Sequence, residues 1–197
     1  MDNFSYLSVL ISIVLGLGLT NLLMGLARVV QLRGRVRIYW PTLAWTFTLL
    51  LAHVQTWWTM FTLRQIDTWT FPLFALVLLQ PVFLFFLSAL ALPDFDRDEQ
   101  LNLRTNYFAQ THWFFGILLA LLLVSLLRGA IVTLTLQGSG FSLADISVGA
   151  DLIFHIAFIT FVAVGGVWKN ELYHKTLAVL SVLTFALYVA TLFTELR

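Results

Sequence analysis

The sequence contains no cysteine and few charged residues. The absence of cysteine excludes a disulfide framework, thiolate metal sites, covalently attached haem and cysteine nucleophiles. Charged residues make up 11% of the chain, against about 25% in a typical soluble domain. A net charge of +1 provides no basic surface for nucleic acid. With an apolar fraction of 60%, these shortages exclude an ordinary soluble enzyme and a disordered chain, and they indicate an integral membrane protein.

Six apolar runs are long enough to cross a membrane, which requires about 20 residues for a hydrocarbon core of about 30 Å. They lie at about 7–27, 40–62, 69–92, 113–134, 145–168 and 175–194. Runs of this length predict helices, because unpaired backbone groups are costly in lipid. The first run follows no cationic segment and ends in no cleavage site, so we expect a retained helix. We predict an all-α integral membrane protein whose residues 1–197 form one compact bundle of six transmembrane helices.

The basic residues predict an orientation for this bundle. Eight of the eleven lysines and arginines fall within or beside the loops after the first, third and fifth runs, namely Arg28, Arg33, Arg35, Arg37, Arg97, Arg104, Lys169 and Lys175. Basic loops are retained on the cytoplasmic side, so both termini are expected on the non-cytoplasmic side. Tryptophans at both ends of the runs support these boundaries as an interfacial belt. We expect the protein in the cytoplasmic membrane of a prokaryote.

The loop between the third and fourth runs is acidic. Asp96 and Glu99 have the spacing of a helix-capping pair, which predicts an interfacial helix over about 97–111 before the fourth span. Asp94, Asp96 and Asp98 have the spacing of a calcium loop. Glu99 stands where that loop requires glycine, however, so no metal site is predicted.

Four polar residues within the runs share one depth. His53 and His155 each lie thirteen residues from the tryptophan at the cytoplasmic end of their run, ~20 Å along a helix. Arg128 and Asp151 lie ~22 Å and ~26 Å from the corresponding tryptophans. Asp151 and His155 also share a helix face through their i, i+4 spacing.

This layer carries two hypotheses. In the first, Arg128, Asp151, His155 and His53 form the ion or proton site of a small channel or transporter-like module. Asn21 and Gln80 are possible lining residues of that site. In the second, the same side chains only hold helices together in a non-catalytic membrane subunit or scaffold. Arg128 has the further option of extending to the outer interface.

The histidines also allow a b-type haem protein as a further alternative. His53 and His155 would form one level of ligands, and His112 with His174 a second level near the cytoplasmic end. No other cofactor is predicted. The sequence contains no phosphate-binding loop, nucleophile elbow or His-Glu-x-x-His motif, so no catalytic residue is predicted.

Other features predict packing and partners. Gly18, Asn21 and Gly25 share one face of the first helix, which favours close helix approach with Asn21 bonding across the contact. Gly116 with Ala120, and Ser125 with Gly129, suggest the same for the fourth helix. The lipid bilayer is the expected partner, with Arg33, Arg35 and Arg37 as candidate ligands of anionic head groups. A homo-oligomer or a membrane-complex subunit is expected because 197 residues enclose little interior.

Overall fold

The chain folds into helices joined by short connections. The computed structural model describes residues 3–64, 66, 68–92, 101–137 and 146–192. In chain order, the elements within these ranges are α1 (Asn3–Gln31), β1 (Val36–Arg37), α2 (Trp40–Leu63), α3 (Phe71–Ala91), β2 (Leu101–Asn102), α4 (Leu103–Gln137), α5 (Ile146–Val167) and α6 (Glu171–Leu192). The predicted all-α fold is confirmed.

Four of these helices are long and apolar enough to cross a membrane. The qualifying stretches are Phe4–Gln31 in α1, Phe71–Ala91 in α3, Leu103–Val132 in α4 and Glu171–Ala190 in α6. The helix α2 carries a histidine, a glutamine and several threonines, which lower its hydropathy. In α5 the apolar stretch among the described residues, His155–Val167, is too short to qualify. Length and composition therefore identify four candidate membrane helices in the described part of the chain.

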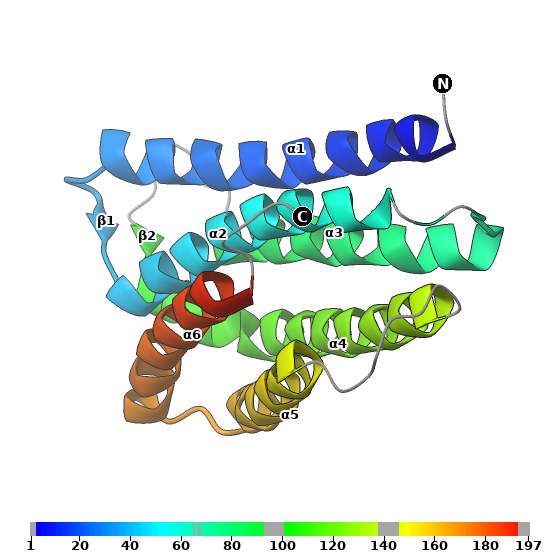
Figure 1. Ribbon diagram of the computed structural model, residues 1–197. Helices are drawn as coiled ribbons and strands as arrows, with labels where there is room; N and C mark the ends of the chain where they lie inside the picture. The colour runs from blue at the N-terminus through cyan, green and yellow to red at the C-terminus, as the bar shows by residue number, and fades with distance from the viewer. Residues whose placement is uncertain (1–2, 65, 67, 93–100, 138–145, 193–197) are drawn as a thin grey trace.

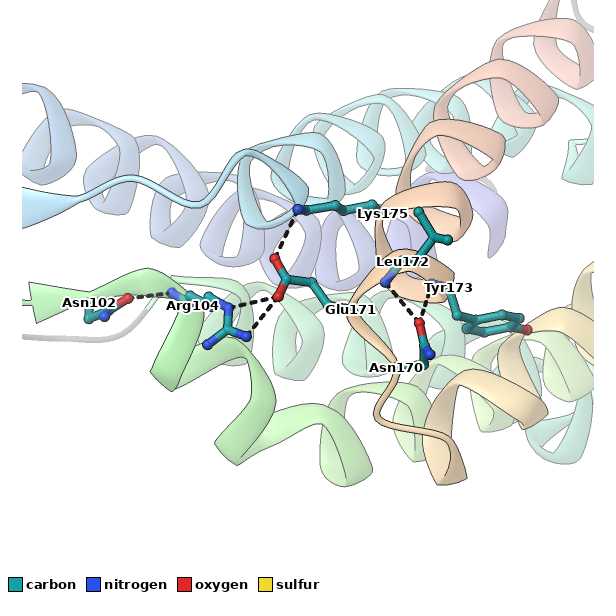
Figure 2. A network of polar contacts seen from close by, with 7 residues as sticks. All are labelled: Asn102, Arg104, Asn170, Glu171, Leu172, Tyr173 and Lys175. Carbon is teal, nitrogen blue, oxygen red and sulfur yellow. Dashed lines mark hydrogen bonds and ion pairs between the residues drawn. The ribbon is translucent and has the colours of Figure 1, made fainter.

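Side-chain caps set the starts of three helices. The Thr70 hydroxyl accepts a hydrogen bond from the Leu73 amide at the start of α3. The Asn102 side chain accepts one from the Arg104 amide at the start of α4. At the start of α6, Asn170 Oδ1 accepts from the amides of Leu172 and Tyr173 at 2.9 and 3.1 Å (Figure 2). These caps satisfy amides that have no partner within their own helix.

The helices pack as a closed ring. Along the ring α1 contacts α3, α3 contacts α4, α4 contacts α5, α5 contacts α6, α6 contacts α2, and α2 returns to α1. The elongated α1, α3 and α4 run alongside one another in Figure 1, and α2 also packs against α3. The main hydrophobic core is continuous through this ring and includes Leu22 of α1, Trp45 of α2, Leu84 of α3, Phe115 of α4, Val162 of α5 and Leu177 of α6.

One end of the bundle is tied together by a strand pair and an ion-pair network. β1 pairs in parallel with β2, with Val36 opposite Leu101 and Arg37 opposite Asn102 (Figure 1). A second small core lies at this end and contains Val29, Val36, Tyr39, Leu92 and Leu103. Arg104 at the start of α4 binds the Glu171 carboxylate at 2.7 Å, and Lys175 binds the same carboxylate at 2.9 Å (Figure 2). The segments before α2, α4 and α6 therefore lie at the same end.

The segment before the fourth span differs from the prediction. Residues 101–102 form β2, and α4 then runs without a break from Leu103 to Gln137, where an interfacial helix over about 97–111 and a separate span over 113–134 were expected. Asn102 caps α4 at its start, and no proline or glycine interrupts the helix before Gly116. Asp94, Asp96, Asp98 and Glu99 lie outside the described residues.

Candidate functional site

A cavity of about 70 Å³ lies inside the bundle, between α2, α3, α4, α5 and α6. One water molecule requires about 10–15 Å³ of such space, so the cavity has room for several waters or a small polar solute. Apolar side chains form most of its wall. The polar lining residues are Thr48, Gln55, Thr56, Gln80, Ser125, His155 and Tyr188. A cavity between helices with this lining is the candidate functional site.

His155 brings three helices together on one side of the cavity. Its Nε2 lies 3.2 Å from Ser125 Oγ, which joins α5 to α4. Its ring stands edge-on to the ring of Tyr188 on α6, with 6.3 Å between centroids. The imidazole is buried. His155 therefore places a buried imidazole at the wall of the cavity.

Gln80 and Thr56 provide amide and hydroxyl groups from α3 and α2. Gln80 Nε2 donates a hydrogen bond to Thr56 Oγ1 at 3.3 Å, and both side chains are buried. The glutamine precedes Pro81, and α3 continues through this proline. Gln80, predicted as a possible lining residue of an ion or proton site, lies at the wall of this cavity.

His53 lies away from this cavity, in the contact between α2 and the helices α1 and α3. Its Nδ1 is 2.7 Å from the Leu49 carbonyl oxygen, and its Nε2 is 3.5 Å from Ser88 Oγ on α3. Gly18 of α1 packs directly against the same Nε2. The expectation that His53 and His155 share a site is therefore not met, although both are buried. Depth along a helix does not determine the direction in which a side chain points.

The register of α4 against α5 bears on Arg128 and Asp151. Ser125 contacts His155, and Phe115 packs against Gly165, so the two helices run antiparallel. Arg128 follows Ser125 by one turn and Asp151 precedes His155 by one turn, which places the two backbone positions at the same level. Arg128 is half-buried. The side chain of Asp151 lies outside what the structure describes.

Asn21 faces outward on α1 and does not line the cavity. Its neighbours on the predicted packing face behave differently. Gly18 packs against His53 and the Phe85 backbone, and Gly25 packs against Leu92. Close approach at α1 therefore depends on the two glycines. No atom of the described residues lies within 4 Å of a Cβ placed at Gly116 or Gly129, so these glycines of α4 mark no close contact with that part of the chain.

The remaining histidines do not form a second level of haem ligands. His174 is fully buried, and both of its ring nitrogens are engaged: Nε2 donates to the Trp168 carbonyl at 3.1 Å, and Nδ1 accepts from the Tyr107 hydroxyl at 2.9 Å. This arrangement leaves no nitrogen for an iron. His112 is exposed on α4 beside Trp113. Of the upper pair, His155 lines the cavity and His53 does not.

Sequence reasoning assigned Ser125 to helix packing and did not single out Tyr188. The signal for Tyr188 was its position well inside an apolar run, whereas belt tyrosines occupy the ends of such runs. Arg33, Arg35 and Arg37 are exposed at the end of the bundle that holds β1 and β2. Comparison of the chain with protein-family models, with curated proteins and with solved structures gives no match.

Proposed function

We propose that the chain crosses the membrane six times, with both termini on the non-cytoplasmic side, and forms a small ion or proton transport module. α2 and α5 contain 24 and 22 residues, which correspond to ~36 Å and ~33 Å of helix and span a core of about 30 Å. The three tied segments share one end of the bundle, as six crossings require. Their basic residues would place this end in the cytoplasm.

The observation that carries the transport proposal is the polar lining of the central cavity. Imidazole, hydroxyl and amide groups from several helices line one shared space within the bundle. Polar groups in the interior of a membrane protein are costly, and they commonly mark the path of an ion or proton. His155 would accept and release the proton, while Ser125, Gln80 and Thr56 would hold the water or ion beside it by hydrogen bonding. Arg128, one turn after Ser125, and Asp151, one turn before His155, would supply charged groups at the next level of the bundle.

Proton flux into proteoliposomes tests this proposal. The purified chain is reconstituted with an internal pH-sensitive dye, and flux is measured at pH 5 and pH 8. We expect the wild type to raise flux above protein-free liposomes. His155→Gln should reduce this flux several-fold, because glutamine keeps a polar side chain but cannot carry a proton. His112→Gln is the matched control, since this histidine is exposed on α4, and its flux should equal the wild-type value.

Two results would contradict the assignment. If His155→Gln conducted as well as the wild type, the proton would not pass through His155. If no variant and no wild-type preparation conducted, the second candidate, a non-catalytic membrane subunit or scaffold, would be favoured. That alternative has its own support in the contacts of His53 with Ser88 and of His174 with Tyr107, which join helices without lining the central cavity. The homo-oligomer and the prokaryotic cytoplasmic membrane stay predictions.

A further inference from the structure

A second, smaller cavity lies between α2, α3 and α4, toward the end of the bundle that holds the strand pair. Its volume is about 20 Å³, and the residues around it include Thr42, Trp45, Tyr107 and Gln110. Three buried polar atoms at this cavity make no hydrogen bond within the described chain, namely Thr42 Oγ1, Trp45 Nε1 and Gln110 Oε1. Only 3% of Thr42 and 2% of Trp45 is exposed. Polar atoms so deeply buried are normally hydrogen-bonded, so this group of atoms requires a partner.

The size and chemistry of the cavity define that partner. One water molecule needs about 10–15 Å³, so a cavity of about 20 Å³ holds one water and no larger solute. The indole N–H of Trp45 is a donor, the Gln110 Oε1 is an acceptor, and the Thr42 hydroxyl is both. The Tyr107 hydroxyl lies beside the same indole but outside hydrogen-bond geometry with Trp45 Nε1, and it donates to His174. A neutral ligand that donates and accepts hydrogen bonds fits this set.

We propose that this cavity binds one ordered water molecule that joins α2 to α4. The water accepts from Trp45 Nε1–H, donates to Gln110 Oε1, and exchanges a further hydrogen bond with Thr42 Oγ1. α2 and α4 contact each other over a short stretch, so a shared water adds a link where direct contact is limited. Trp45 also lines the central cavity, so its side chain borders both spaces. The site does not depend on the transport proposal.

A high-resolution crystal structure of the full chain tests the site directly. We expect a single solvent peak at hydrogen-bond distance from Thr42 Oγ1, Trp45 Nε1 and Gln110 Oε1. A dry cavity, or one closed by rearranged side chains, would overturn the proposal.

The sign of a stability change gives a second test. Thr42→Val keeps the shape of the side chain and removes its hydroxyl. If the hydroxyl binds water, Tm falls by about 2–4 °C, the shift that corresponds to roughly one lost hydrogen bond in a chain of this size. If the cavity is dry, the substitution removes an unpaired buried hydroxyl and Tm rises, which would refute the site.

Two controls accompany this measurement. Thr42→Ser restores the hydroxyl and should recover Tm relative to Thr42→Val. Thr46→Val, one turn farther along α2, removes a hydroxyl that bonds the Thr42 carbonyl and does not line the small cavity. The solvent peak should persist in a crystal structure of Thr46→Val, and its loss there would count against the proposed ligands.

Discussion

Trp45→Ala should lower the free energy of unfolding by about 3–5 kcal/mol. The indole is 2% exposed and stands edge-on to Phe114 and Phe115, with 5.4 and 5.5 Å between ring centroids. Helix association in a membrane depends on such packing, since lipid itself is apolar. Alanine would remove these contacts and leave a space beside both cavities that Trp45 lines.

The comparison variant for this prediction is Trp57→Ala on the same helix. Trp57 is 49% exposed and has an edge contact with Phe61. Surface substitutions usually change stability by no more than about 0.5 kcal/mol. Chemical unfolding of both variants in detergent micelles measures the difference. Equal losses of unfolding free energy in the two variants would show that the packing of Trp45 does not stabilise the bundle more than a surface contact does.

Gly18→Ala should lower the free energy of unfolding by about 1–3 kcal/mol, the usual cost of overpacking a filled contact. A methyl group at this position would overlap His53 Nε2 and approach Phe85 Cα to 3.3 Å. The imidazole is held by the Leu49 carbonyl and contacts Ser88, so it cannot withdraw without losing hydrogen bonds. α1 would have to move away from α2 and α3.

Gly16→Ala is the matched control, two residues earlier on α1. Among the residues that the structure describes, no atom lies within 4 Å of a Cβ at Gly16. Alanine should therefore cost nothing there, and its helix propensity is better than that of glycine by about 0.5–1 kcal/mol. Thermal or chemical unfolding of the two variants gives the difference. His53→Ala added to Gly18→Ala should recover part of the loss, since the two sites are in contact. The described packing would be contradicted if Gly18→Ala were as stable as the wild type and if adding His53→Ala recovered no stability.

The ends of three helices were predictable, because the length of an apolar run is a property of the sequence alone. The runs at 40–62, 69–92 and 145–168 correspond to α2, α3 and α5 to within two residues at each end. The start of α4 was not predictable in the same way. It depends on the pairing of residues 101–102 with Val36 and Arg37, which lie two helices earlier in the chain. The acidic residues before it, 94–99, gave no sign of this pairing.

The sequence predicted how deep the two histidines lie along their helices, but it did not predict which way their side chains face. Thirteen residues separate His53 and His155 from their tryptophans, yet one packs against α1 and α3 and the other lines the cavity. The rotation of a helix is set by how all its neighbours pack, and apolar residues surround each histidine in the sequence. The small cavity at Thr42 and Gln110 could not be predicted from the sequence for a related reason. Its volume depends on how large side chains from three helices pack against one another.

The parallel pairing of β1 with β2 has a consequence for biosynthesis. Val36 emerges from the ribosome long before Leu101, and α2 and α3 are made between them. The strand that pairs with β1 therefore becomes available only after both intervening helices have been synthesised. Closure of this end of the bundle is consequently a late event, in which the newly made β2 completes a structure that the first loop began.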